Sequence, residues 1–184
     1  MKTYISILRG INVGGNRIIK MDALGALYTE LGCCNVLTYI QSGNVIFRHI
    51  GINPDELETR IAGKITETFN FDVPVIVKEL EEMSQIIADN PFTKGTSREI
   101  AHMHVTFLSG KPEGEKFLHI KDGQFLPDEF ALANKSIYLY CPNGYGKTKL
   151  TNSFWESKLN LQATTRNWKT ATELLHLAEK LNGK

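Results

Sequence analysis

The order of apolar segments over residues 3–77 constrains the fold of this chain more than any other feature of its sequence. Residues 3–8 are rich in β-branched and aromatic side chains, which favours a β-strand. Apolar residues then recur at helical spacing before Gly32, a residue suited to ending a helix: Leu24, Leu27, Tyr28 and Leu31. The chain is therefore expected to begin with a strand, a loop and a helix.

A hairpin and a second helix are expected next. Residues 36–40 and 44–48 are short apolar runs separated by a polar, glycine-containing turn of the kind that joins antiparallel strands. Asn53 and Pro54 supply an N-cap and a first helical residue, ahead of one apolar helix face: Leu57, Ile61, Ile65 and Phe69. Residues 71–77 predict another strand. The resulting order, strand-helix-strand-strand-helix-strand, is that of the split βαβ or ferredoxin-like unit.

The second half of the sequence predicts the same order after a connecting helix at 79–88 and a polar linker at 93–98. The expected elements are, in order, a strand at 102–108, a short helix at 112–119, strands at 125–132 and 136–141, a helix at 148–159, a strand at 163–165 and a C-terminal helix at about 167–181. We therefore predict an α+β protein with two ferredoxin-like (split βαβ) subdomains and antiparallel sheets. Their limits are predicted at 1–78 and 101–184, joined by the connecting helix and linker at 79–100.

Charge and composition exclude several classes of function. The formal net charge of +1, from 21 basic and 20 acidic residues, removes the bulk attraction to polyanions that a dedicated nucleic-acid binder normally shows. No apolar stretch approaches the ~20 residues needed to span a bilayer, and the first residues lack the pattern of a signal peptide. We expect a cytoplasmic protein without a membrane partner. Cys33, Cys34 and Cys141 form neither a disulfide framework nor a metal-ligand spacing.

Four motifs together resemble a known family. They are the run from Arg9 to Gly15, the sequence TYIQSGNV at 38–45, Asn90-Pro91-Phe92, and TTRNWKT at 164–170. The chain resembles, over nearly its whole length, domain-of-unknown-function family 1697, which is mainly bacterial. The resemblance implies a pair of ferredoxin-like subdomains and brings no activity, substrate, cofactor or catalytic residue.

The loop after the first strand is rich in glycine but does not match a dinucleotide-binding fingerprint. Gly10, Gly14 and Gly15 give G-x-x-x-G-G instead of G-x-G-x-x-G, and a hairpin follows in place of a parallel crossover. In one interpretation, the backbone amides of Gly14, Gly15 and Asn16 form an anion-binding concavity with Arg9 and Lys20. In the other, the loop only needs positive dihedral angles, and Arg9 pairs with an acidic neighbour.

Motifs that resemble nucleotide, metal or catalytic sites are incomplete. Gly146-Lys147-Thr148 matches the end of a phosphate-binding P-loop, but Cys141 stands where the first glycine is required. His102 and His104 share one face of a predicted strand without a third ligand near them, so we interpret them as surface histidines. Ser42 lacks the setting of a nucleophile elbow. We assign no metal site and no catalytic residue.

The segment Thr164–Thr170 is the other unusual stretch. Asn167 or Thr165 can cap the last helix, which places Arg166 and Lys169 where the helix dipole disfavours cations. A bound anion would relieve that conflict. Alternatively, Trp168 is a core anchor between the subdomains and Arg166 bonds to backbone carbonyls.

Our hypothesis is that three polar stretches form one cleft that binds a small anionic or phosphorylated ligand, because each is dense in donors and lacks amphipathic periodicity. The predicted ligand-binding residues are Arg9, Asn12, Gly14, Gly15, Asn16, Ser42, Asn44, Arg166, Asn167 and Lys169. The sequence identifies no cofactor, reaction or oligomeric state, and it leaves open whether the chain is an enzyme.

Two other hypotheses remain open. The chain could be a nucleic-acid or protein interaction module whose open sheet face presents Tyr4, Tyr39 and Phe47 for stacking. The near-zero net charge makes nucleic acid a less favoured partner. In a purely structural interpretation, the three stretches only hold the two subdomains together. This interpretation predicts buried, mutually satisfied arginines and no pocket.

Overall fold

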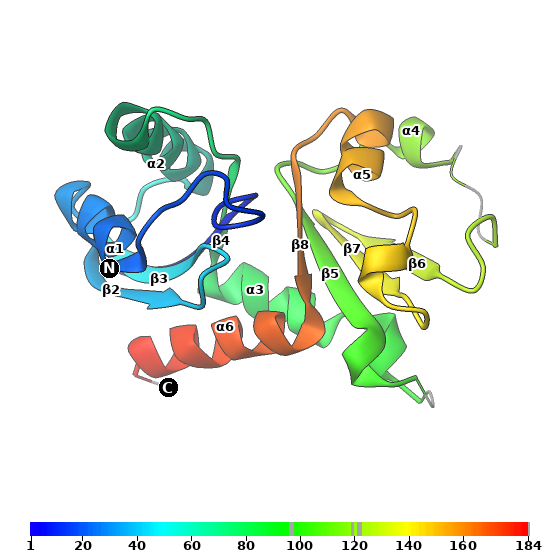
Figure 1. Ribbon diagram of the computed structural model, residues 1–184. Coiled ribbons are helices and arrows are strands. Elements are labelled where there is room, and N and C mark those ends of the chain that lie inside the picture. The colour runs from blue at the N-terminus through cyan, green and yellow to red at the C-terminus, as the bar shows by residue number, and fades with distance from the viewer. Residues whose placement is uncertain (96–97, 119, 121–122, 184) are drawn as a thin grey trace. The chain divides into compact units, whose positions relative to one another are not determined.

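A computed structural model describes residues 1–95, 98–118, 120 and 123–183, and these form two compact units (Figure 1). The first unit comprises Met1–Ser84 and Glu173–Lys184, and the second comprises Gln85–Thr172. Each unit contains one four-stranded antiparallel sheet with helices. The predicted α+β class with two antiparallel sheets is therefore confirmed.

The first unit has the predicted order of elements, and its sheet order is β2-β3-β1-β4. The elements are β1 (Lys2–Leu8), α1 (Met21–Glu30), β2 (Cys34–Tyr39), β3 (Asn44–His49), α2 (Pro54–Phe69) and β4 (Val75–Glu79). The strand predicted at 71–77 begins later and ends later than expected. It begins after Pro74, a residue that has no N–H to donate to a sheet and whose carbonyl accepts from the Arg9 amide at 3.0 Å.

Helices α1 and α2 cover the same face of this sheet, as the split βαβ order requires. The buried residues that pack together there come from both helices and from β1, β3 and β4: Leu24, Leu27, Tyr28, Leu57, Ile61, Ile65, Tyr4, Leu8, Val45, Phe47, Val75 and Val77. Asn53 is the N-cap of α2, since its side chain accepts from the Asp55 amide at 3.0 Å. The helical spacing in the sequence therefore identified the buried faces correctly.

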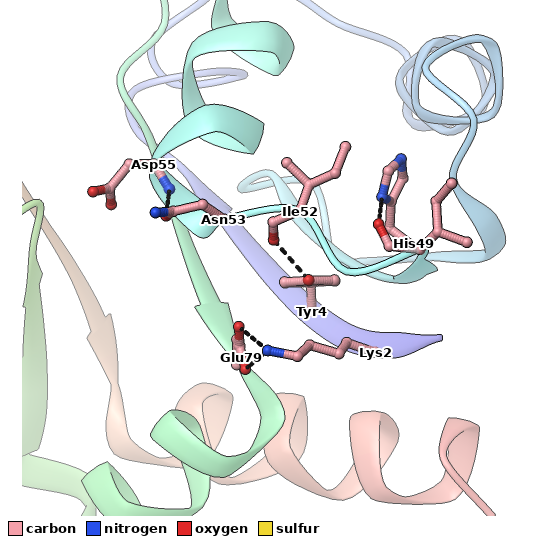
Figure 2. Close-up of polar contacts among 8 residues, drawn as sticks. Lys2, Tyr4, His49, Ile52, Asn53, Asp55 and Glu79 are labelled. Atoms are coloured by element: carbon pink, nitrogen blue, oxygen red, sulfur yellow. Dashed lines mark hydrogen bonds and ion pairs between the residues drawn. The ribbon is translucent and has the colours of Figure 1, made fainter.

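The connection between β3 and α2 is fixed to the middle of β1 (Figure 2). The Tyr4 hydroxyl donates to the Ile52 carbonyl at 2.8 Å, and His49 Nδ1 lies 2.7 Å from the Ile50 carbonyl. At the end of the sheet, the Lys2 ammonium contacts both carboxylate oxygens of Glu79 at 2.8 and 2.9 Å. Tyr4 is thus a core residue whose polar end is already occupied.

The burial of Tyr4 corrects one detail of the interaction-module hypothesis. Tyr4 and Phe47 are fully buried and stack on each other with ring centroids 5.6 Å apart. Strand alternation indicates which residues share a face, but it does not say which face the helices cover. Of the three aromatics proposed for base stacking, only Tyr39 is partly exposed.

The second unit repeats the order of the first, and its sheet order is β6-β7-β5-β8. The elements are β5 (Met103–Leu108), α4 (Gly114–Leu118), β6 (Glu129–Ala133), β7 (Ser136–Tyr140), α5 (Asn152–Leu159) and β8 (Ala163–Asn167). Trp155 of α5 is fully buried beneath the sheet and contacts Phe117, Phe130 and Phe154. An aromatic cluster therefore forms the core of this unit.

Several boundaries in the second unit differ from the prediction. Helix α5 begins at Asn152 and not at residue 148, because the Thr151 side chain accepts from the Phe154 amide at 3.2 Å and caps it there. Strand β6 begins at Glu129, after a turn at 125–128, and β8 extends to Asn167. His119, at the predicted end of the short helix, and residues 96–97 of the predicted linker lie outside the described residues.

The predicted connecting and C-terminal helices are both present, as α3 (Leu80–Ala88) and α6 (Trp168–Leu181). Short 3₁₀ turns lie at η1 (Pro91–Thr93), η2 (Ile100–His102) and η3 (Tyr145–Lys147). Among the described helices, none has the length and apolar character needed to cross a bilayer.

Candidate functional site

The base of the β1–α1 loop is held by one asparagine side chain. Asn12 donates from Nδ2 to the carbonyls of Ile19, at 2.9 Å, and Gln41, at 2.8 Å. Its Oδ1 accepts from the Ile19 amide at 2.8 Å. Asn12 has a φ of 56°, in the left-handed region that asparagine tolerates better than most residues. This side chain therefore joins the two ends of the loop to the turn between β2 and β3.

That turn, residues 41–44, packs directly on the base of the loop. Asn44 is fully buried, and its Nδ2 donates to the Tyr39 carbonyl and to Ser42 Oγ, both at 3.1 Å. The Leu8 amide donates to the Gly43 carbonyl at 2.8 Å. A Cβ on Gly43 would lie 2.7 Å from Ile11 Cδ1, so only glycine fits. Two of the three predicted polar stretches thus meet within the first unit.

The tip of the loop is a tight turn that faces solvent. Val13 and Asn16 form an isolated antiparallel bridge, and the Asn16 amide donates to the Val13 carbonyl at 3.1 Å. Gly14 and Gly15 lie between them with φ values of 60° and 77°, which explains the glycine pair. Both glycines are exposed, and within the described part of the chain neither amide donates a hydrogen bond.

The same loop carries an excess of positive charge. No Asp or Glu occurs in residues 1–21, whereas Arg9, Arg17 and Lys20 lie in or beside the loop. Arg17 lies over Gly10, because a Cβ built on Gly10 would be 3.4 Å from Arg17 Nη1. Arg17 has no salt bridge to any carboxylate in the described ranges. The loop thus presents a cation and, at its tip, two exposed backbone amides.

Arg17 was not among the predicted ligand-binding residues. Its φ of 49° is unusual for arginine, and its carbonyl accepts from the Asn12 amide at 3.2 Å. The sequence contained one signal for it, namely the acid-free run that surrounds it.

The third predicted stretch belongs to the second unit. Asn167 caps α6, since its Oδ1 accepts from the Thr170 amide at 2.7 Å. Arg166 lies on β8 and not on the helix, and its Nη1 donates to the Thr165 carbonyl at 3.0 Å. Burial lowers the pKa of Arg166 to about 10. Trp168 is 4% exposed and contacts Tyr138 edge to face.

A hollow of about 460 Å³ lies at the start of α6. It is lined by Asn167 and Lys169 together with Ile100, Ala101, Trp168 and Thr172. Lys169 is exposed, whereas the Oδ1 atom of Asn167 is occupied by the helix cap. The lining is largely apolar in character, and Lys169 supplies its one formal charge.

The remaining sequence motifs have structural explanations in this part of the fold. Lys147 ends the short turn η3, and the Gly144 amide donates to the Cys141 carbonyl at 2.9 Å, so this segment does not form a P-loop. His104 stacks on Tyr145 with centroids 4.8 Å apart, and burial lowers the pKa of His104. Among the described residues, no group of three potential ligands is placed to hold a metal ion.

The cysteines differ in exposure. Burial raises the pKa of the Cys33 thiol to about 12 and that of Cys141 to about 11, while Cys34 is exposed. Cys33 belongs to the core beneath the helices, which fits the interpretation of buried cysteine as a small apolar residue.

Comparisons with known proteins agree with this architecture. A family model described as a protein of unknown function (DUF1697) matches residues 1–138. The structure of conserved bacterial protein SP0830 from Streptococcus pneumoniae is similar over 96% of this chain and 98% of that chain, with a TM-score of 0.74 and 22% sequence identity, a likeness that shows the fold. A comparison with curated proteins finds no match. Because the family model covers well over half of its length, the chain belongs to the DUF1697 family.

Proposed function

We propose that the chain binds a small anionic or phosphorylated ligand and that the β1–α1 loop supplies the main contacts. The observation that carries this proposal is the position of the Arg17 guanidinium over Gly10, in a segment that has no acidic residue and whose tip exposes the amides of Gly14 and Gly15. Guanidinium groups and backbone N–H groups are the donors that proteins commonly use for phosphate and carboxylate oxygens.

The predicted ligand residues of the first unit separate into two roles. Arg17 and Arg9 supply charge, and the amides of Gly14 and Gly15 orient the anion, while the Asn16 amide closes the turn by its bond to the Val13 carbonyl. Asn12, Ser42 and Asn44 support the loop from beneath, since each of these side chains has a partner in the base of the loop or in the adjacent turn. Support of this kind holds the donors in place before a ligand arrives and so reduces the entropy lost on binding.

In the second unit, we propose Arg166, Asn167 and Lys169 as a separate set of ligand-binding residues at the start of α6. Lys169 is the exposed cation of this set and lines the hollow at the start of α6. Arg166 and Asn167 contribute mainly by shaping the backbone there, through the bonds to the Thr165 carbonyl and the Thr170 amide.

An NMR titration of the isotope-labelled full chain with pyrophosphate tests the proposal, with chloride at matched ionic strength as the reference. We expect saturable shifts of the Gly14, Gly15 and Asn16 amide resonances, and weaker binding in Arg17→Ala. Arg60→Ala is the matched control, because Arg60 is an exposed arginine of the same unit that pairs with Glu56 on its own helix. Equal binding by the Arg17 and Arg60 variants, or shifts that do not saturate, would refute the proposal.

An oligonucleotide offers the same phosphate chemistry as a small ligand, and a second titration separates the two sources. Val13 and Ile18, 63% and 62% exposed, flank the tip of the loop and could contact bases or sugars. Phosphate-driven binding of a polymer weakens steeply with salt concentration, because many counterions are released together. Tight, steeply salt-dependent binding of single-stranded RNA or DNA, without saturable binding of pyrophosphate, would favour the interaction-module alternative.

A further inference from the structure

A cavity of about 370 Å³ in the second unit lies outside all the predicted ligand-binding stretches. Two segments line it: residues 124–128, which precede β6, and the segment from Asn143 to Lys149, which precedes α5. The volume falls within the range of roughly 300–1,000 Å³ that small-molecule sites occupy.

Two lysines of the second segment lie on either side of a buried threonine. Thr148 has φ and ψ of −73° and 150°, so the backbone between the two lysines is extended. Thr148 is 8% exposed, and its Oγ1 accepts from the Leu150 amide at 3.1 Å. Lys147 and Lys149, on either side of it, are exposed and line the cavity.

Among the described residues, no carboxylate forms a salt bridge with Lys147 or Lys149, although several other lysines of the chain have such partners. The Asn143 side chain, exposed at the same cavity, adds an amide donor. One wall of the cavity therefore carries two ammonium groups and an amide.

The first segment forms an apolar wall. Phe125 is half-buried and packs against Phe154 and Phe130, with centroids 5.2 and 6.1 Å away, so the aromatic core holds this wall in place. Leu126 is 71% exposed, and Pro127 follows it. The Asp128 amide donates to the Phe125 carbonyl at 2.9 Å and closes the turn.

We propose that this cavity binds a small organic anion that has an apolar or aromatic body, such as an aryl phosphate or aryl carboxylate. Lys147, Lys149 and Asn143 bind the anionic group, and Leu126 and Pro127 contact the body. Asp128, on the apolar wall segment, disfavours a second negative group on that body by like-charge repulsion. This site lies in the second unit and is independent of the β1–α1 loop.

An NMR titration of the full chain with phenyl phosphate and, separately, with inorganic phosphate tests this inference. We expect saturable shifts of the Asn143 and Gln124 side-chain amides with phenyl phosphate and weaker binding of inorganic phosphate. The double variant Lys147→Met, Lys149→Met should bind phenyl phosphate about fivefold more weakly or worse, as expected from the loss of two exposed charge interactions. Lys135→Met is the control, because Lys135 is a partly exposed lysine in the β6–β7 turn of the same unit and does not line the cavity.

A second variant tests the apolar wall without disturbing the core. Leu126→Gln changes a residue that is largely exposed, so the fold should persist, and it should weaken phenyl phosphate binding while leaving inorganic phosphate unchanged. Any one of three results would overturn the inference. The wild-type chain could bind the two phosphates with equal affinity, the double variant and Lys135→Met could lose equal affinity, or the shifts could fail to saturate. The Gly14 and Gly15 resonances report on the β1–α1 loop in the same spectra, so failure of one site is distinguishable from failure of the other.

Discussion

Asn12 Nδ2 donates to the Gln41 carbonyl across 2.8 Å and thereby joins the β1–α1 loop to a turn 29 residues further along the chain. The same amide group donates to the Ile19 carbonyl, and Oδ1 accepts from the Ile19 amide. One side chain thus supplies hydrogen-bond partners to backbone groups of Ile19 and Gln41. The position of Arg17 over Gly10 depends on this support, since Arg17 lies between Asn12 and Ile19.

Asn12→Ala removes all three of these bonds and leaves backbone groups without partners. We expect a loss of about 1–3 kcal/mol in the free energy of unfolding, measured by urea denaturation. Asn16→Ala is the control, because the Asn16 side chain makes one exposed contact of 3.5 Å to the Gly14 carbonyl. If the two variants are equally stable, Asn12 does not hold the loop.

Gly43→Ala should destabilise the chain far more than Gly14→Ala. Both glycines have positive φ, 77° and 60°, so both substitutions carry a backbone penalty of about 1 kcal/mol. A Cβ on Gly43 would also lie 2.7 Å from Ile11 Cδ1 and 2.8 Å from Leu8 Cβ, whereas a Cβ on Gly14 meets nothing within 4 Å. The steric conflict adds about 1–3 kcal/mol at Gly43 alone. Similar urea midpoints for the two variants would contradict the packing described at this turn.

The order of elements could be predicted from sequence because hydrophobic periodicity records it directly. Ile61 and Ile65 lie one helical turn apart and are both buried. The start of α5 could not be predicted, since Thr148 and Thr151 are both suitable N-caps. Which threonine caps the helix depends on the tertiary structure. The Thr148 hydroxyl faces inward and accepts from the Leu150 amide, and the backbone at Thr148 is extended and not helical.

The candidate site was only partly predictable for a similar reason. The sequence predicted Gly14, Gly15 and Asn44 as ligand-binding residues. It did not indicate which of them support the loop and which face solvent. That distinction follows from burial, since Asn44 is fully buried and the two glycines are exposed. Arg17 was missed because no local sequence motif predicts that its guanidinium lies over Gly10, seven residues earlier in the chain.

Thiol reactivity should distinguish Cys34 from the other cysteines. The thiolate is the reactive form, and burial raises the pKa of Cys33 to about 12 and that of Cys141 to about 11, so both stay protonated at pH 8. Cys34 is exposed. A chromogenic disulfide reagent should label one thiol rapidly in the native chain, and Cys34→Ser should abolish that fast phase. Rapid labelling of Cys34→Ser would show that a second thiol is accessible.

His104 should make the stability of the chain depend on pH below neutrality. Burial lowers the pKa of His104 from its ordinary value of 6.5, so the folded chain disfavours the charged ring. Its contribution to stability is present above the unfolded pKa and is lost as the pH falls through 6.5 toward the lower folded value. His104→Gln should flatten this part of the curve of unfolding free energy against pH. His176→Gln, at an exposed position, is the control for the effect of replacing a histidine.

Tyr28 and Ser6 should behave as a coupled pair in the core of the first unit. The Tyr28 hydroxyl donates to Ser6 Oγ at 2.7 Å, and both residues are fully buried. Tyr28→Phe leaves the Ser6 hydroxyl without its donor, and Ser6→Ala leaves the Tyr28 hydroxyl without its acceptor, so each change should lower the free energy of unfolding by about 1–3 kcal/mol. The double variant removes both polar groups, and its loss should be clearly smaller than the sum of the two single losses. Additive losses in the double-mutant cycle would show that the two hydroxyls do not depend on each other.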